Sequence, residues 1–98
     1  MKSALEATLE RQAVTHARKR GVDSIKLNLQ GRRGWPDRLF LLPRGRPLFI
    51  ELKRTGRRPS PIQLIVHTRL RRRGYKIFII DDLDDFKRIF ERALRSSI

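Results

Sequence analysis

A glutamate and a lysine two positions apart, Glu51 and Lys53, close an apolar run that starts at Pro47. Side chains alternate between the two faces of a β-strand, so Glu51 and Lys53 share one face and Leu52 points to the other. A charged pair at the end of an apolar strand is costly to bury unless it is paired, metal-bound or catalytic. Asp37 supplies a second carboxylate where another apolar run begins. Two carboxylates and a lysine at neighbouring strand ends predict a metal-dependent site that hydrolyses phosphodiesters.

Hydrolysis of a phosphodiester needs an activated water, neutralisation of charge on the phosphoryl oxygens, and help for the leaving oxygen. Mg²⁺ or Mn²⁺ held by carboxylates can supply all three, and a positioned ammonium adds to the charge stabilisation. Each short motif is weak evidence alone, because a Glu-x-Lys triplet arises by chance about one time in four in a chain of this composition. The alternative interpretations are an exposed ion pair for Glu51 with Lys53, and a turn residue for Asp37.

The first helix carries two glutamates on its apolar side, Glu6 and Glu10. Ser3 and Glu6 have the spacing of a capping box, in which the Glu6 carboxylate reaches back to the start of the helix. Glu10 lies a full turn further on, where no cap explains it. Glu10 is therefore the preferred metal ligand from this helix, and Glu6 is the alternative.

Four further side chains each have a structural and a functional interpretation. Gln63 ends a second capping box, so it either caps the helix or orients Lys53 or a phosphate. His16 and His67 have no metal-ligand spacing to another His or Cys, and both are predicted to lie on helix surfaces. Trp35 either packs on the sheet or stacks on an exposed base, and packing is the favoured interpretation.

The composition favours nucleic acid as the partner. The formal net charge is +14, from 24 Lys+Arg against 10 Asp+Glu, and 18 of the basic residues are arginine. Arginine's planar fork suits phosphate, so we expect tight and salt-dependent binding with little sequence preference. No segment has the long apolar face of an interfacial membrane anchor, so no membrane partner is expected. The arginines beside the predicted site are expected to contact phosphates: Arg32, Arg33, Arg54, Arg57 and Arg58.

Length and composition also set the domain organisation and compartment. With 98 residues, the chain is expected to form one domain over 1–98. The chain has no cysteine, which excludes disulfides and thiolate metal sites. Its start lacks the apolar stretch of a signal peptide, and no apolar run approaches membrane-spanning length. A soluble cytoplasmic protein is expected.

Apolar periodicity, caps and turn residues divide the chain into seven elements in the order αβββαβα. This order predicts an α/β fold with a mixed sheet flanked by helices. The strand at 75–80 is apolar enough to be central in that sheet. The second helix is expected to bury Ile62, Ile65, Val66 and Leu70. Helices are expected at 4–20, at 61–74 and after Asp82, and strands at 25–29, 37–42, 48–53 and 75–80.

Taken together, the motifs resemble those of the PD-(D/E)XK nuclease superfamily, and more closely its virus-type replication-repair nuclease (VRR-NUC) family. The resemblance spans nearly the whole chain and implies a restriction-endonuclease-like core. Trp35 stands where a smaller apolar residue is more usual in the family. The segments that carry the resemblance are Glu6-Ala7-Thr8-Leu9-Glu10, Gly34-Trp35-Pro36-Asp37-Arg38, Leu48-Phe49-Ile50-Glu51-Leu52-Lys53, Ser60-Pro61-Ile62-Gln63 and Gly74-Tyr75-Lys76-Ile77.

The resemblance also implies an activity. In the family, a divalent metal would be held by Asp37, Glu51, the Leu52 carbonyl and a helix glutamate, with Lys53 assisting the nucleophilic water. Small members resemble Holliday-junction resolvases, so the resemblance implies a homodimeric DNA endonuclease that cuts branched or four-way DNA in repair or recombination. Two alternatives stay open, a non-catalytic nucleic-acid-binding module and a nicking or flap nuclease without junction preference.

The last helix has an apolar stripe that is a candidate dimer interface. Phe86, Phe90 and Leu94 recur at helical spacing, and Ile98 follows near the terminus. The simpler interpretation, that this stripe faces the core of its own chain, is slightly favoured.

Overall fold

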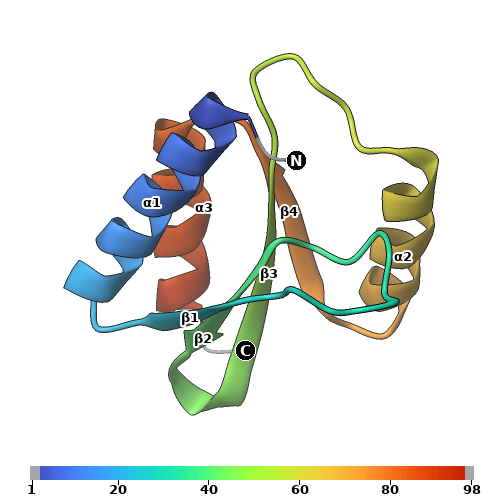
Figure 1. Cartoon of the computed structure of the whole chain (residues 1–98). Helices are drawn as coiled ribbons and strands as arrows, with labels where there is room; N and C mark the ends of the chain where they lie inside the picture. The colour runs from blue at the N-terminus through green and yellow to red at the C-terminus, as the bar shows by residue number, and fades with distance from the viewer. Residues whose placement is uncertain (1–2, 97–98) are drawn as a thin grey trace.

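The computed structural model describes residues 3–96, so Ile98 lies outside the described residues. A four-stranded mixed sheet forms the middle layer, with α1 and α3 on one face and α2 on the other (Figure 1). The predicted α/β class and the order αβββαβα are confirmed. The helices are α1 (Ala4–Lys19), α2 (Pro61–Arg72) and α3 (Leu83–Arg95), and the strands are β1 (Asp23–Lys26), β2 (Arg38–Leu42), β3 (Arg46–Leu52) and β4 (Lys76–Ile80).

The strand pairing gathers the charged residues at one end of the two central strands, β2 and β3. Strands β2 and β3 pair antiparallel, so the amino end of β2, preceded by Asp37, lies beside the carboxyl end of β3. Strands β3 and β4 pair parallel, and Lys53 N donates to Ile80 O over 2.9 Å just beyond that pairing. Residues 37, 51 and 53 are therefore brought to the same end of the sheet.

Two expectations about the strands are wrong. Strand β1 spans Asp23–Lys26 rather than 25–29, because it pairs with β2 only as far as Arg38, where β2 begins. Strand β4 lies at the edge of the sheet rather than at its centre, since β3 is its only neighbour among the described strands. Its side chains Ile77 and Ile80 are buried under helices on opposite faces, and this double cover explains an apolar edge strand. The other strand and helix bounds agree with the sequence analysis to within about two residues.

The face that α2 buries also differs from the expected one. Val66 and Leu70 are buried as predicted, but Ile62 and Ile65 are exposed, with 57% of the Ile65 surface accessible. His67, predicted to lie at the surface, is fully buried instead. Gln63 bonds to β3 at the start of the helix, and this contact sets the rotation of α2 so that positions 63, 66, 67 and 70 face the sheet.

The larger core lies between the sheet and the pair α1 and α3. Phe40 of β2 packs there against Phe86 and Phe90 of α3, and all three are 0% exposed. The apolar stripe of α3 is therefore core in this chain, which is the favoured interpretation, and its two phenylalanines are not available as an interface. Within residues 3–96, no helix has both the length and the apolar character needed to cross a membrane.

Glu91 links α3 to α1, the helix that carries Glu6 and Glu10. Its Oε1 accepts a 2.8 Å hydrogen bond from Arg20, and its Oε2 lies 2.9 Å from the His16 ring. The hydrogen bond from Arg20, together with His16, holds the pKa of Glu91 below its ordinary value of 4.5. A carboxyl with a lowered folded pKa stabilises the fold above the unfolded pKa, and this stabilisation is lost as the pH falls through the folded pKa.

Replacing Glu91 with Gln is therefore expected to lower the free energy of unfolding at pH 7 by about 0.5 kcal/mol, the scale of an exposed ion pair. The difference from wild type is expected to shrink as the pH falls from 4.5 through the lower pKa of folded Glu91, where the carboxyl becomes protonated. Urea unfolding at pH 7 and under acid conditions measures both values. An equal difference at both pH values would contradict the assigned role of the charge.

Candidate active site at the carboxyl end of strand β3

Glu51 is a buried carboxylate, with only 2% of its surface exposed. It lies on the α2 face of the sheet, since Leu48, Ile50 and Leu52 alternate onto the other face. Its Oε2 accepts a 2.9 Å hydrogen bond from Gln63 Nε2 and lies 3.4 Å from Lys53 Nζ. An amide and an ammonium thus offset part of the desolvation cost of the charge.

Gln63 caps helix α2, which is one of the two roles that the sequence left open, and its side chain also contacts Glu51 rather than Lys53. Its Oε1 accepts a 2.8 Å hydrogen bond from Ser60 N, and its own backbone N–H donates to Ser60 Oγ, which completes a capping box. The same amide donates through Nε2 to Glu51. The start of α2 is therefore fixed to the Glu51 carboxylate by a single side chain.

Asp37 is held against the end of β3 by its carboxylate. Its Oδ2 accepts a 2.7 Å hydrogen bond from Leu52 N, the residue between Glu51 and Lys53. Pro36 before it is buried, and Trp35 packs edge-on against Phe49 at 6.5 Å between ring centroids, in agreement with the packing interpretation. The contact with Leu52 places the second carboxylate beside the Glu51–Lys53 segment.

The two glutamates of α1 lie in different surroundings. Glu10 is 6% exposed and its Oε2 receives a 2.6 Å hydrogen bond from Arg38, which also donates to Ser24. The Glu6 Oε1 instead accepts a 3.3 Å hydrogen bond from Arg54 N, directly after Lys53. Glu6 therefore points to the same end of β3 as the other site residues, whereas the Glu10 charge is paired on β2.

All five arginines predicted to contact phosphates are exposed. Arg32 and Arg33 lie in the loop before Gly34, which packs on the first turn of α2 at Ile62. The other three lie in the segment that joins β3 to α2. Both basic segments therefore border the turn of α2 that carries Gln63. Positive charge around a recessed acidic site attracts a phosphate backbone without depending on base sequence. The three in the β3–α2 segment are Arg54, Arg57 and Arg58.

The donor atoms at this end of strands β2 and β3 fit a hard divalent cation. Asp37 and Glu51 offer carboxylate oxygens from adjacent strands, and the Leu52 backbone lies between them. Mg²⁺ commonly takes one or two carboxylates and keeps several waters, so it does not need a closed cage of protein ligands. These donors are oxygen atoms, and the described residues include no cysteine, so the set suits Mg²⁺ or Mn²⁺ and not a metal that prefers thiolates.

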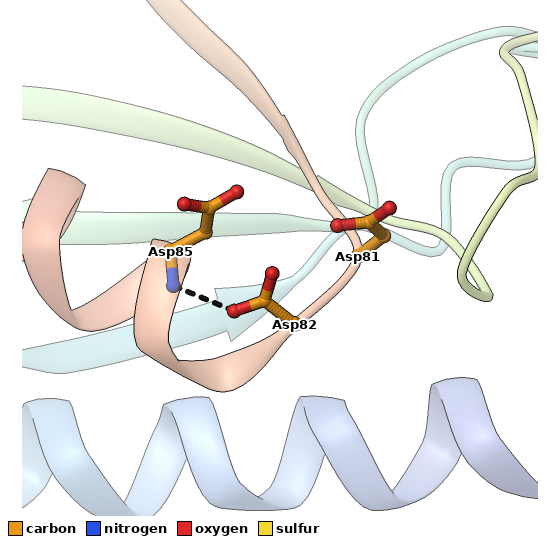
Figure 2. A group of neighbouring side chains, drawn as sticks. All are labelled: Asp81, Asp82 and Asp85. Carbon is orange, nitrogen blue, oxygen red and sulfur yellow. Dashed lines mark hydrogen bonds between the residues drawn. The ribbon is translucent and has the colours of Figure 1, made fainter.

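A second acidic group lies at the start of α3. Asp81, Asp82 and Asp85 form the one set of three acidic residues within 3–96 whose ligand oxygens all lie within 4.8 Å of one another. Figure 2 shows Asp82 accepting a hydrogen bond from the backbone N–H of Asp85, at 2.8 Å. Asp85 also pairs with Arg88. Helix capping and the favourable position of carboxylates at a helix amino terminus account for this group.

Sequence reasoning missed two side chains at the site. Arg38, next to Asp37, holds the Glu10 carboxylate, and no spacing rule identifies such a pair across a helix and a strand. His67 is buried on α2, where burial and then the charges of Arg71 and Lys53 lower its pKa, while Asp37 raises it. Its spacing of four residues from Gln63 places both on one face of α2, and this spacing could have predicted that His67 faces the sheet.

Comparisons with known proteins give one related sequence and one similar solved structure. No family model matches the chain. The phage protein "Putative nuclease p44" of Acyrthosiphon pisum secondary endosymbiont phage 1 is 39% identical over 84 residues, which cover 86% of this chain and 90% of that protein. A solved structure described as "VRR_NUC domain" superposes with a TM-score of 0.84 at 32% identity, and covers 91% of this chain and 97% of that one.

Gly34 is the residue that allows the Asp37 loop to approach α2. Its φ is +84°, and an added Cβ would lie 2.7 Å from the carbonyl oxygen of Ile62, whereas Gly31, at φ +72°, has open space around it. Gly34→Ala is expected to cost about 1–2 kcal/mol for the left-handed backbone and about 1–3 kcal/mol more for the overlap. Gly31→Ala is the matched control and is expected to show only the first cost.

Urea unfolding of the two variants measures this difference. Because the overlap pushes on the turn that carries Gln63, Gly34→Ala is also expected to lower any activity of the site, while Gly31→Ala leaves it intact. Equal stability losses for the two glycines would contradict the close approach.

Proposed function

Because the chain belongs to the VRR-NUC family, we propose that it is a divalent-metal-dependent endonuclease that hydrolyses phosphodiester bonds in DNA. The observation that carries the proposal is the joint arrangement of Asp37, Glu51 and Lys53 at one end of the central strands β2 and β3. Leu52 N fixes Asp37, while Gln63 and Lys53 both approach one oxygen of the buried Glu51. Exposed arginines in the two segments that border the site support DNA as the substrate.

Asp37, Glu51 and the Leu52 carbonyl would hold the metal, for which Mg²⁺ and Mn²⁺ are both suitable. When bound, such an ion neutralises phosphoryl charge and lowers the pKa of a coordinated water. Gln63 keeps the Glu51 carboxylate in a fixed orientation through its 2.9 Å hydrogen bond. The Lys53 ammonium, with 18% of its side chain exposed, can stabilise negative charge that develops on the phosphate or position the attacking water.

We propose Glu6 as the helix carboxylate of the site, in place of Glu10, which the sequence alone favours. The Glu6 carboxylate touches the backbone at Arg54, one residue beyond Lys53. The Glu10 carboxylate is paired with Arg38 at 2.6 Å, and releasing it would leave a largely buried guanidinium without its counter-charge. A structural role therefore accounts for Glu10.

The proposed substrate structure is branched DNA, with the four-way junction as the first choice. A four-way junction is close to two-fold symmetric, and its resolution requires two matched nicks on opposing strands. Each chain carries one such site, so a symmetric homodimer would place two sites on one junction. Since Phe86 and Phe90 are buried within the chain, the dimer surface has to involve other residues. Exposed apolar residues on α2, among them Leu64 and Ile65, are available for that contact.

A non-catalytic nucleic-acid-binding module is the second candidate. Such a module has no need for an intact acidic site, and loss of one or more members would leave binding unaffected. Here Asp37, Glu51, Lys53 and Gln63 are all present and mutually arranged, which favours the enzyme.

Replacing Glu51 with Gln, or Lys53 with Ala, is expected to lower the cleavage rate by about 10²–10³-fold or more. The first change removes a carboxylate charge that would hold the metal, and the second removes positive charge beside the reacting phosphate. DNA affinity is expected to change little, since the exposed arginines supply most of it. Gel assays of plasmid cleavage and fluorescence anisotropy measure the two quantities. Glu91→Gln and Lys76→Ala are the matched controls outside the site. Cleavage at the wild-type rate by the Lys53→Ala variant would refute the assignment.

Substitutions of the two glutamates of α1 are expected to have different effects on cleavage and on stability. Glu6→Gln should lose cleavage and keep its stability, because its carboxylate is partly exposed and accepts one long hydrogen bond. Glu10→Gln should keep cleavage and lose about 1–3 kcal/mol of unfolding free energy, because it weakens a charge-assisted hydrogen bond. Thermal melts and cleavage assays on both variants provide the data. If Glu10→Gln lost cleavage and Glu6→Gln kept it, Glu10 would be the helix carboxylate of the site.

Light scattering at micromolar concentration, without and then with a four-way junction, tests the homodimer. The expected mass is that of two chains in at least the junction-bound state. On a supercoiled plasmid with an extruded cruciform, coupled nicks are expected to give linear product directly. A monomeric mass in both conditions together with single uncoupled nicks would rule out the resolvase and favour a nicking nuclease.

A further inference from the structure

His67 is the polar side chain of the core whose presence the site described above does not explain. The residue is 0% exposed, and among residues 3–96 neither of its ring nitrogens has a hydrogen-bond partner. Buried polar groups are nearly always satisfied, and an unsatisfied one costs free energy that an apolar residue of similar size would avoid. A buried histidine of this kind therefore calls for a role that depends on its polar atoms.

The position of His67 points to the Lys53 ammonium. His67 lies one turn after Gln63 on the face of α2 that covers the sheet, so it follows the residue that holds Glu51. Burial lowers the pKa of His67 first, the charges of Arg71 and Lys53 lower it further, and Asp37 raises it. Lys53 lies on the same face of β3 as Glu51, so its side chain and the buried His67 ring both face the layer between the sheet and α2. With its pKa below the ordinary 6.5, the ring is neutral at pH 7.

A neutral imidazole offers one acceptor nitrogen and one N–H donor. Of the two nearby cations, Arg71 already donates to the Ile77 carbonyl at 3.0 Å. Lys53 has three donors and lies at the longer distance of 3.4 Å from Glu51 Oε2, an oxygen that Gln63 also occupies. When the Glu51 carboxylate serves as a metal ligand, less of its charge is available to Lys53, and the ammonium needs another acceptor.

We propose that His67 is a positioning residue of the nuclease site, whose ring accepts a hydrogen bond from the Lys53 ammonium and fixes it beside the scissile phosphate. This inference rests on the proposed function, since it assigns a task to Lys53 in that reaction. His67 acts through Lys53 and does not itself touch the substrate. Burying a ring nitrogen without a partner lowers the stability of the fold, and this loss is explained if the nitrogen is a pre-formed acceptor for the ammonium.

Variants at position 67 distinguish this role from packing. His67→Leu is expected to melt at or above the wild-type temperature, because it removes a buried polar group without a partner. Its cleavage rate constant is expected to fall about 10–100-fold, the usual effect of losing a residue that orients a site group, with KM for DNA unchanged. Leu70→Val, on the same buried face, is the matched control, and it should lower the melting temperature and keep the rate.

Two amide variants test the hydrogen bond itself. Gln places an amide near the position of Nε2, and Asn places one near Nδ1, so His67→Gln or His67→Asn is expected to recover part of the rate lost in His67→Leu. Recovery by one of them identifies the nitrogen that accepts. Wild-type cleavage by His67→Leu would overturn the proposal, and so would failure of both amides to recover any of the loss, because shape alone would then explain the residue.

Nitrogen NMR of the His67 ring provides a readout that does not depend on cleavage. Adding Mg²⁺ alone is expected to shift the resonance of one ring nitrogen in the wild type and to leave it unshifted in Lys53→Met. An unshifted ring in the wild type, while the Asp37 and Glu51 carboxyl resonances respond to Mg²⁺, would overturn the role of His67 and leave the metal site standing. No response of these carboxyl groups would instead contradict the proposed function.

Discussion

The burial of the Glu51 carboxylate is the constraint on which the surrounding structure depends. A charge with 2% exposure has lost most of its hydration, and the protein must replace that hydration with its own groups. Gln63 and Lys53 approach the same carboxylate oxygen, and Gln63 in turn caps α2 through Ser60. The end of β3 and the start of α2 are thus joined at one acidic side chain. Such a group is expensive to retain for stability alone, and a cation would explain its retention.

The positive charge of the surface is explained by binding rather than by stability. A formal net charge of +14 on 98 residues repels itself and opposes compaction, so it is poorly explained by stability. The arginines that flank the site project from two loops, and these loops meet at the first turn of α2 because Gly34 allows close contact with Ile62. The surface would concentrate a polyanion at the recessed carboxylates. Binding and chemistry are then carried by different residues, which is why substitutions can separate them.

Much of this arrangement could be predicted from the sequence, because local patterns determine it. Caps at Ser3, Ser60 and Asp82 fixed the helix starts, and alternation along residues 47–53 placed Glu51 and Lys53 on one face. Contacts between distant segments were not predictable in the same way. The burial of His67 in place of Ile65 depends on how α2 rotates when Gln63 meets Glu51, and the Arg38 pairing of Glu10 depends on where α1 crosses β2. The edge position of β4 could not be predicted, because an edge strand with helices on both faces is as apolar as a central one.

The central claim, that Asp37 and Glu51 together hold a divalent cation, is tested most directly by thermal unfolding in the presence of Mg²⁺ or Mn²⁺ without DNA. A ligand that binds only the folded state stabilises it by about 2.7 kcal/mol at a hundred times its Kd, so the melting temperature should rise with metal concentration. The account predicts this rise in the wild type and its loss in both Asp37→Asn and Glu51→Gln. A melting temperature that does not respond to either metal in the wild type, or that responds equally in the two variants, would contradict the account.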